Sequence, residues 1–321
     1  MGKKTNNVLI GIDGSVQALN AASYASRIFP PDRTRITLFF VDEGSHNYYA
    51  DTGDKPDVSE KEKAKYKQWL ESREKIINAY FEQITGFFTG NGFSSGHVNF
   101  IRRELSKGVT RDIIEESKKD YDLLVVGKTG MCSATGIPMG SVTEKLFSYI
   151  FHIPLVVVAG RPETDKLLLG FDGSKGAVSA VTGLVPFLGP GKKVMLCNII
   201  RSMGTMNPAQ DDYLTSFNGW TYLPEVESER ITTQKNRIEK SMEKQKQWMI
   251  DSGINEHDVA TCVHAGHMSR SQSLVEKARK EGYGTLVLGR RGNSAVVEFI
   301  MGRVGRKSLQ ISDTMAVWIM N

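Results

Sequence analysis

The sequence lacks any run of about 18 consecutive apolar residues, so we expect no transmembrane helix and no association with a membrane. Cysteine is scarce: Cys132, Cys197 and Cys262 are far apart in the sequence and odd in number. A disulfide framework is therefore not expected, and a reducing compartment fits this pattern better. We accordingly expect a cytoplasmic protein.

Sequence motifs of catalysis are also missing. The chain contains no Walker A lysine motif, no His-Glu-x-x-His, no Gly-x-Ser-x-Gly and no defensible arrangement of Ser, His and Asp. Cys262, His264 and His267 lie close in sequence, but their spacing matches no strong zinc signature and no fourth ligand is near. We therefore predict no catalytic residue and no metal site built from side chains alone.

Clustered basic charge is absent as well. The formal net charge of +5 is spread over both halves, and the basic residues mostly alternate with acids, as between Glu60 and Glu74. A nucleic-acid-binding protein usually gathers Lys and Arg on one face or in one run. The pattern favours solvated helix faces, and we expect no nucleic-acid partner.

What the sequence does contain is an internal repeat. Its 321 residues are many for one domain and natural for two. Three segments return in the same order after roughly 160 residues, a period that indicates duplicated domains: Val8–Ser15 as Leu167–Ser174, Asp122–Gly127 as Gly284–Gly289 and, more loosely, His152–Val158 as Asp313–Ile319. A short polar stretch, Gly160–Asp165, separates the copies, so we predict domains at residues 1–160 and 165–321.

Each copy predicts the same alternation of strands and helices. An apolar strand ends in Asp-Gly-Ser; an Ala-rich helix, a second strand, an insertion with a long helix, a third strand, a helix and two more strands follow. The expected helices include Val16–Phe29 and Ala177–Leu188, and the expected strands include Arg35–Val41, Lys193–Ile200, His97–Ile101 and Val259–Val263. Such alternation with apolar strands predicts a parallel sheet covered on both faces. The aromatic residues of the first long helix, Trp69 among them, are expected in the core.

A glycine pattern follows the fourth strand of the first copy. Gly127-Lys128-Thr129-Gly130 is followed by nine residues and then by Gly140-Ser141, which opens a helix-like segment. Glycines let the backbone approach a ligand, and the N–H groups and dipole of a helix N-terminus favour phosphate oxygens. Ser141 and Thr143 can add hydroxyl hydrogen bonds. The pattern favours an anion site.

An aspartate ends the first strand of each copy, Asp13 and Asp172. Ligands of open α/β sheets bind at the carboxyl edge where the strand order reverses, between the first and fourth strands. A carboxylate there can accept hydrogen bonds from ribose hydroxyls or face a metal ion. It can equally cap the following helix, and the sequence leaves both roles open for both residues.

Taken with the Asp-ended first strand and the Pro-containing fifth strand, the Gly-x2-Gly-x9-Gly-Ser spacing resembles the ATP-binding branch of the universal stress protein family. The resemblance covers essentially the whole chain. It implies, in each copy, a doubly wound open sheet of five parallel strands in the order 3-2-1-4-5, with helices on both faces, in the Rossmann-like class of adenine nucleotide alpha hydrolase folds. It also implies an ATP-binding regulatory protein of the stress response.

Carried over residue by residue, the resemblance implies a site for ATP, AMP or ADP in the first copy, with Mg²⁺ beside the phosphates. The implied residues are Asp13, Val41, Gly127, Gly130, Gly140 and Ser141, with Val142 and Thr143 next to them. At most slow ATP hydrolysis is expected, because no general base is aimed at a γ-phosphate.

The second copy departs from the motif, because Arg303 replaces its serine. The corresponding residues are Asp172, Ile199, Gly289, Gly292, Gly302 and Arg303. Arg303 could pair with a phosphate or fill the phosphate pocket, and the sequence leaves both possibilities open. A third possibility is that Arg290, Arg291, Arg303 and Arg306 contact the phosphates of a nucleotide bound elsewhere.

The resemblance also implies how the copies associate. Single-domain relatives pair through their fifth strands, so Pro154–Val158 and Met315–Ile319 are expected to form an intramolecular pseudo-dimer, and two chains a homodimer with a further protein partner. Two alternative functions stay open: a nucleotide-dependent hydrolase or transferase of the same fold, or a scaffold whose second copy binds a protein or apolar ligand. The insertion Met203–Leu223, which carries Met and aromatic residues, motivates the scaffold.

Overall fold

The computed structural model describes residues 5–44, 60–130, 139–201, 224–266, 269–290 and 303–321. The chain divides into two compact units, Met1–Arg161 and Pro162–Asn321, which we call copy 1 and copy 2. The insertion Met203–Leu223 lies outside the described residues.

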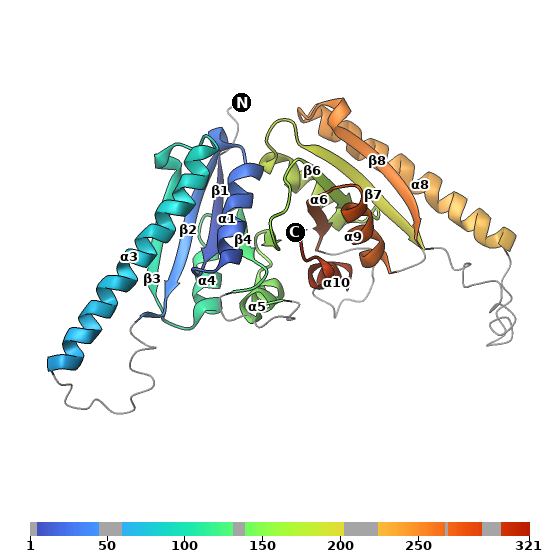
Figure 1. Cartoon of the computed structure of the whole chain (residues 1–321). Coiled ribbons are helices and arrows are strands. Elements are labelled where there is room, and N and C mark those ends of the chain that lie inside the picture. Colours follow the sequence, from blue (N-terminus) through green and yellow to red (C-terminus); the bar gives the residue numbers. More distant parts are fainter. Residues whose placement is uncertain (1–4, 45–59, 131–138, 202–223, 267–268, 291–302) are drawn as a thin grey trace, which may run out of the picture. The chain divides into compact units, whose positions relative to one another are not determined.

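Copy 1 is a five-stranded parallel sheet with helices between successive strands (Figure 1). Its elements are β1 (Asn6–Ile12), α1 (Val16–Ile28), β2 (Thr34–Asp42), α3 (Glu60–Gly90), β3 (Val98–Glu104), α4 (Val109–Ser117), β4 (Leu123–Gly127), α5 (Ser141–Tyr149) and β5 (Leu155–Val158). The strand order is β3-β2-β1-β4-β5, and all four neighbouring pairs are parallel. The predicted α/β fold and strand order are confirmed for this copy.

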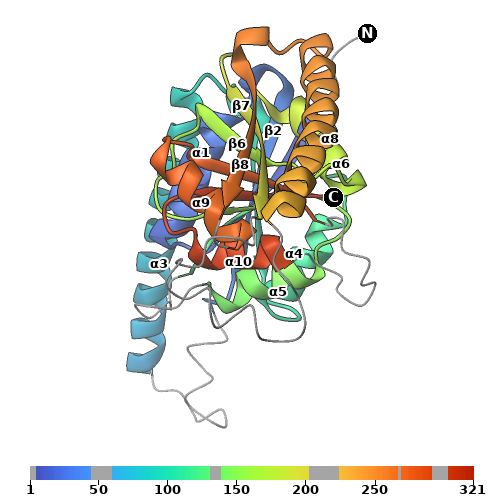
Figure 2. The same ribbon diagram turned by 90° about the vertical axis from the view of Figure 1, so that its right-hand side faces the viewer.

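Copy 2 repeats the arrangement (Figure 2). Its elements are β6 (Lys166–Gly170), α6 (Lys175–Leu184), β7 (Lys193–Arg201), α8 (Pro224–Asp251), β8 (Val259–Gly266), α9 (Arg270–Lys280), β9 (Thr285–Gly289), α10 (Arg303–Ile311) and β10 (Ala316–Met320). The order β8-β7-β6-β9-β10 is again the predicted one, with parallel pairs throughout.

The central strands are buried on both faces. In β1 and β4, ten of twelve residues are buried, and the exceptions are Asn7 and, at the end of β4, Gly127. In copy 1, α1 packs with α3 and α4 packs with α5, and in copy 2 α6 packs with α8 and α9 with α10. The first three strands are added towards one edge of the sheet, and the last two are added towards the other edge. Because the crossovers are right-handed, this change of direction places the two helix pairs on opposite faces of the sheet.

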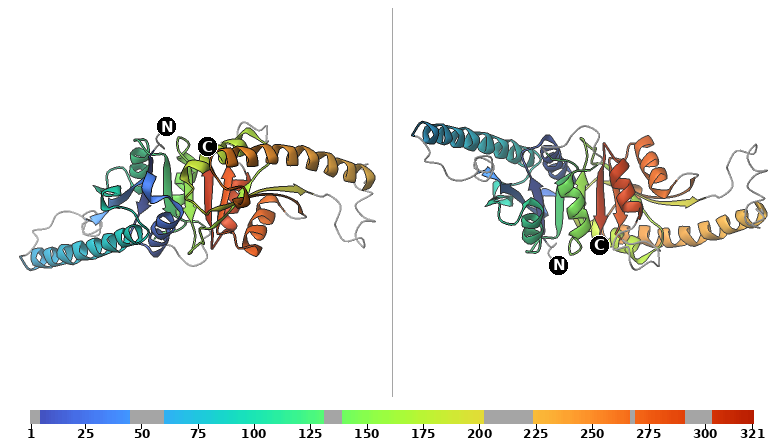
Figure 3. Two further views of the ribbon diagram at one scale, coloured as in Figure 1. Left: turned by 90° about the horizontal axis from the view of Figure 1, so that it is seen from above. Right: turned by 90° about the horizontal axis from the view of Figure 1, so that it is seen from below.

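The long helix of copy 1 corrects one sequence prediction. Its buried apolar residues, Ile77, Phe81, Ile84 and Phe88, all belong to its C-terminal half. Trp69, by contrast, is 38% exposed. With 31 residues, α3 is roughly 46 Å long. The seven-residue β1 spans only about 23 Å. The helix therefore extends beyond the strands (Figure 3). Its first turns lie past the ends of the strands, and the sheet is reached near Arg73, which pairs with Asp42.

Element ends differ from the predictions for local reasons. The predicted helix Ala177–Leu188 ends at Leu184, and Val185–Phe187 forms a 3-10 turn, because Pro186 supplies no backbone N–H to an α-helix. Strand β3 continues to Glu104, beyond the predicted end, since its hydrogen bonding to β2 runs through polar positions of an edge strand. Among the helices that the structure describes, none has both the length and the apolar character needed to cross a bilayer.

Candidate functional site

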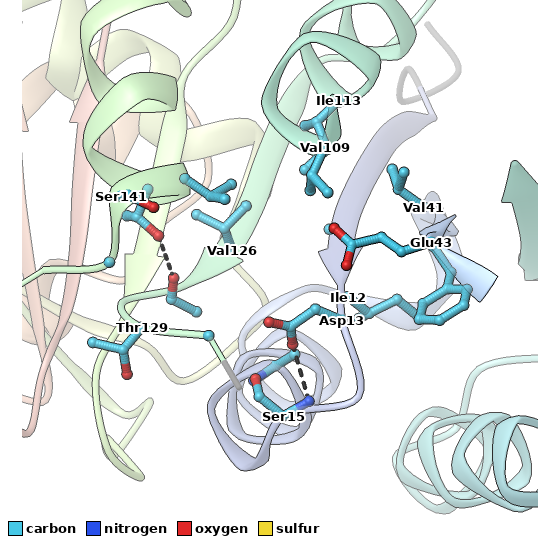
Figure 4. Close-up of a pocket in the computed structure, with 18 of the residues that line it drawn as sticks. Ile12, Asp13, Ser15, Val41, Glu43, Val109, Ile113, Val126, Thr129 and Ser141 are labelled. Atoms are coloured by element: carbon cyan, nitrogen blue, oxygen red, sulfur yellow. Dashed lines mark hydrogen bonds between the residues drawn. The ribbon is translucent and has the colours of Figure 1, made fainter. Parts of the chain in front are cut away.

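A cavity of about 600 Å³ opens at the carboxyl edge of the copy 1 sheet. Residues from β1, β2, β4, α3, α4 and α5 line it. All eight residues implied for copy 1 are on its wall: Asp13, Val41, Gly127, Gly130, Gly140, Ser141, Val142 and Thr143. This volume is within the range of small-molecule sites. Positions that span 130 residues of sequence therefore share one hollow (Figure 4).

Asp13 shapes the turn between β1 and α1. Its Oδ1 accepts a hydrogen bond from the Ser15 backbone N–H at 3.0 Å, and Gly14 between them has φ +86°. The side chain that caps α1 is that of Ser15, whose Oγ accepts the Ala18 N–H at 3.1 Å. Tyr80, whose hydroxyl donates to the Ser15 carbonyl, has its pKa raised by burial and by the negative charge of Asp13. The capping alternative thus falls to Ser15, and Asp13 stays partly exposed at the cavity.

The three motif glycines allow close approaches. A Cβ on Gly130 would lie 2.7 Å from Oδ2 of Asp13, and one on Gly127 would lie 3.0 Å from the Gln17 backbone in α1. A Cβ on Gly140 would lie 3.2 Å from Cα of Thr129. The lack of a side chain at Gly127 therefore lets β4 approach α1, and at Gly140 it lets the start of α5 approach Thr129. At Gly130 it leaves room for the carboxylate of Asp13.

Helix α5 begins at the cavity without a side-chain cap. Gly140 occupies the N-cap position and makes no side-chain hydrogen bond, and Ser141 at the first helical position is exposed. The first-turn N–H groups of a helix have no partner within the helix, so this end offers donors to an anion. Thr143 is buried and its hydroxyl donates to the Gly127 carbonyl at 2.8 Å, so it holds α5 against the end of β4.

The opposite side of the cavity is apolar. Val41, Val109, Ile113 and Val126 face it from β2, α4 and β4, and the carboxylate of Glu43 lies among them (Figure 4). A flat apolar group can be buried there while a polar part reaches Asp13 and the start of α5. The cavity therefore has one end that is apolar apart from the Glu43 carboxylate, and one end with hydrogen-bond donors.

The long helix contributes two residues that the sequence prediction missed, Trp69 and Arg73. The guanidinium of Arg73 lies 5.7 Å from the centre of the Trp69 ring and forms an ion pair with Asp42 at the end of β2. Burial raises the pKa of Asp42, but hydrogen bonds from Arg73, the Gly44 N–H and Arg102 lower it to about 2. The signal in the sequence was the i,i+4 spacing of Trp69 and Arg73 in a helix too long for its sheet.

Copy 2 keeps the turn after its first strand. Asp172 accepts the Ser174 N–H at 3.0 Å, and Ser174 caps α6. Ile199 is buried in β7, and a Cβ on Gly289 would lie 2.4 Å from the Gly176 carbonyl oxygen. Gly292 and Gly302 lie outside the described residues. The structure therefore places the strand-end positions of copy 2 as in copy 1.

The described arginines of copy 2 differ in burial. Arg290 is 7% exposed, and its Nε donates to Asn321 Oδ1 at 2.6 Å. Arg303 is the first residue of α10 and is exposed, as is Arg306. Arg291 lies outside the described residues. Whether these arginines contact the phosphates of a nucleotide stays a prediction.

The comparisons with known proteins agree with this geometry. A family model described as the universal stress protein family matches residues 4–159. Copy 1 is a universal stress protein domain. The predicted resemblance is confirmed by this match and by the fold.

Solved structures extend the likeness of fold to the whole chain. A universal stress protein from Archaeoglobus fulgidus superposes with a TM-score of 0.55 at 15% identity, covering 99% of this chain and 97% of that one. A protein of unknown function from Pseudomonas aeruginosa gives a TM-score of 0.54 at 11% identity, covering 99% of this chain and 93% of that one. A search of curated protein sequences gave no match. At these identities the superpositions show that the two-copy fold is shared, and nothing about ligands.

Proposed function

We propose that copy 1 binds an adenine nucleotide, ATP or its products AMP and ADP, as the ligand of a regulatory stress protein. The observation that carries the proposal is the cavity itself, in which Asp13 and the uncapped start of α5 face one hollow with an apolar far end. A nucleotide needs this division, because its base is flat and largely apolar while its phosphates need donors.

The phosphates are placed at the start of α5. The backbone N–H groups that follow Gly140 and the hydroxyl of Ser141 supply hydrogen-bond donors at the start of α5. The positive end of the helix dipole is at the same place and favours a negatively charged ligand. Gly130 keeps the loop after β4 free of side-chain atoms beside the aspartate. Each of these features would weaken if a side chain entered the loop.

The ribose is placed at Asp13, whose carboxylate can accept hydrogen bonds from two hydroxyl groups. The base then lies among Val41, Val109, Ile113 and Val126. A Mg²⁺ ion would be held by phosphate oxygens, with Asp13 as the protein carboxylate beside them, and would supply charge neutralisation. Hard oxygen donors of this kind suit Mg²⁺.

Copy 2 is proposed not to hold a nucleotide in the same way. Gly11 pairs with Phe39 and Gly170 with Cys197, so Asn198 takes the place of the cavity residue Phe40. Asn198 is buried and its side-chain amide donates to the Phe171 carbonyl at 2.6 Å. A polar side chain held to the end of β6 therefore stands in copy 2 where the phenyl ring of Phe40 lines the cavity of copy 1.

Titration calorimetry of the purified protein with ATP and Mg²⁺ tests the proposal through a matched pair of variants. Asp13→Asn should weaken binding by about tenfold or more, because a hydrogen bond to a charged group contributes about 1.5–3 kcal/mol. Asp172→Asn makes the same change in the same turn of copy 2 and should leave the affinity unchanged. Equal effects of both variants, or no uptake of ATP by the wild type, would refute the assignment.

The same protein samples separate binding from catalysis. If the chain is a hydrolase or transferase, ATP turnover should exceed one event per bound nucleotide over minutes and respond to a second substrate. The proposal expects bound nucleotide to be recovered largely intact over that time.

A further inference from the structure

Two of the three cysteines lie side by side in copy 2. Cys197 of β7 and Cys262 of β8 are register partners in a parallel strand pair (these strands face the viewer in Figure 2). Neighbouring strands are about 4.8 Å apart, and register partners direct their side chains to the same face of the sheet. This spacing is within the Cα–Cα range that a disulfide can bridge, about 4.4–6.8 Å. The two thiols are free in the structure.

A lysine of the covering helix lies against this pair. Lys277 of α9 has a side chain only 12% exposed, its ammonium donates to Glu281 Oε1 at 2.6 Å, and its proximity lowers the pKa of Cys262. Cys197 is 1% exposed, whereas Cys262 is partly accessible at the edge strand. One thiol is therefore open to small solutes beside a cation, and the other is sheltered behind it.

Copy 1 has no such chemistry in the same place. The register partners there are Phe39 and Ile101, both without a reactive group. Lys277 is the eighth residue of α9, and the eighth residue of α4 is Glu116, a buried carboxylate paired with Arg103. In copy 1 an apolar pair of residues lies beneath a helix that carries a glutamate. In copy 2 a pair of thiols lies beneath a helix that carries a lysine at the same position.

The surroundings shift the pKa values of the two thiols in opposite directions. The hydrogen bond from Cys197 and the positive charge of Lys277 outweigh burial and lower the pKa of Cys262 to about 6. The interaction with Cys262 and burial raise the pKa of Cys197. Among the described residues, Glu281 and Tyr283 also interact with the pair, and the Tyr283 hydroxyl lies 3.4 Å from the Met195 sulfur.

We propose that Cys262 and Cys197 form a hydroperoxide-reactive thiol pair that closes reversibly to a disulfide. The Cys262 thiolate attacks one oxygen of hydrogen peroxide, the O–O bond breaks, and Cys262 becomes a sulfenic acid while hydroxide leaves and is protonated to water. The Cys197 sulfur then attacks the sulfenic sulfur, and its thiol proton leaves with the hydroxyl as a second water. Both thiols are oxidised together by two electrons, peroxide is reduced, and a dithiol restores the pair.

Three features carry the assignment together. The register brings the sulfurs within bonding reach, the accessible thiol is the one beside Lys277, and the buried thiol cannot itself meet bulk oxidant. Reactive cysteines sit in electropositive, partly exposed surroundings, and a resolving thiol beside them prevents further oxidation.

Mass spectrometry of the full chain in a Cys132→Ser background tests the proposal. After a short exposure to micromolar hydrogen peroxide, the intact mass should fall by two hydrogens, and peptide mapping should link Cys197 to Cys262. Cys197→Ser should instead trap a sulfenic acid at Cys262 that reacts with dimedone, and Cys262→Ser should leave Cys197 unoxidised. A wild-type pair that stays reduced at peroxide levels that oxidise free glutathione would overturn the proposal.

The role of the lysine has its own readout. Lys277→Gln should slow the reaction with peroxide at pH 7 by about tenfold and shift the midpoint of its pH profile upward, because less of Cys262 is thiolate. Lys277→Arg should restore most of the rate. Lys280→Gln removes an exposed lysine from the same helix and should change neither quantity. Equal rates for Lys277→Gln and wild type would assign Lys277 a structural role only and remove it from the proposal.

Discussion

The two copies share one fold and differ in the side chains at the carboxyl edge of the sheet. Both turn from the first strand into a helix through an Asp-Gly-Ser triplet, with the aspartate accepting the serine N–H at 3.0 Å in each. At the start of the helix before the last strand, copy 1 has Ser141 where copy 2 has Arg303. The turn after the first strand is therefore the same in both copies, while the residue that opens the last helix differs.

A second difference concerns the tie between that helix and the sheet. In copy 1 the Thr143 hydroxyl holds α5 to the Gly127 carbonyl. The third residue of α10 in copy 2 is Gly305, which has no side chain to make such a bond. Copy 2 thus keeps the strand order of copy 1 without this side-chain tie between helix and sheet.

The largest expected effect comes from closing the hollow of copy 1. Gly130→Ala would put a methyl group 2.7 Å from Asp13 Oδ2, so the carboxylate or the loop must move. We expect nucleotide affinity to fall by about 100-fold, or roughly 2.8 kcal/mol, because the ligand needs the carboxylate in place. The free energy of unfolding should change by less than about 0.5 kcal/mol, because Oδ2 is the end of a flexible side chain that can turn away. Calorimetry and urea denaturation measure the two quantities.

A second glycine provides the control for that substitution. A Cβ on Gly86 of α3 would meet nothing within 4 Å. Gly86→Ala should leave nucleotide binding unchanged and raise the free energy of unfolding by about 0.5–1 kcal/mol, the ordinary gain in a helix. Loss of binding in this variant would show that the Gly130 effect is not local.

The next comparison sets Glu116 against Lys277. The Glu116 side chain is 0% exposed and pairs with Arg103 and with Lys119, whereas Lys277 keeps partial contact with solvent. Glu116→Gln should lower the free energy of unfolding by about 2 kcal/mol, since it leaves cationic partners without their buried charge. Lys277→Gln should cost less than half of that in the same urea titration. Equal losses would show that the two positions are structurally alike despite their opposite charges.

The smallest effect depends on pH. Asp42, held by Arg73 and Arg102, has a pKa of about 2, below the value near 4 of an unfolded chain. A carboxyl whose folded pKa is lowered stabilises the fold above the unfolded pKa and loses that contribution as the pH falls towards 2. Asp42→Asn should therefore cost about 1–2 kcal/mol at pH 7 and almost nothing near pH 2. A pH-independent difference in urea midpoints would contradict the ion pair.

The alternation of strands and helices and the repeated turn could be predicted from sequence because they rest on local signals, whereas the strand order was implied by the resemblance to the family. Apolar strands alternate with amphipathic helices, and the Asp-Gly-Ser triplet marks each first strand end. The eight copy 1 positions were grouped by the same resemblance, and the meeting of the carboxyl ends of parallel strands at one edge explains why they line one cavity. Their binding role stays a prediction until a ligand is measured.

What the sequence did not predict depends on long-range geometry. Trp69 fitted a helical apolar stripe, and only the length of α3 relative to the sheet leaves it exposed beside Arg73 at the cavity. Cys197 and Cys262 are 65 positions apart, so nothing local shows that they share a register. Pairing between the fifth strands of the two copies and association of two chains also stay predictions.

The most direct test of the central claim is the nucleotide released by the denatured protein, measured by mass spectrometry as moles per mole of chain after incubation with ATP and Mg²⁺. The account predicts about one adenine nucleotide per wild-type chain and almost none for Gly130→Ala. Two nucleotides per chain, or one that survives in Gly130→Ala, would contradict the placement of the site in copy 1. No nucleotide at all would contradict the proposed function.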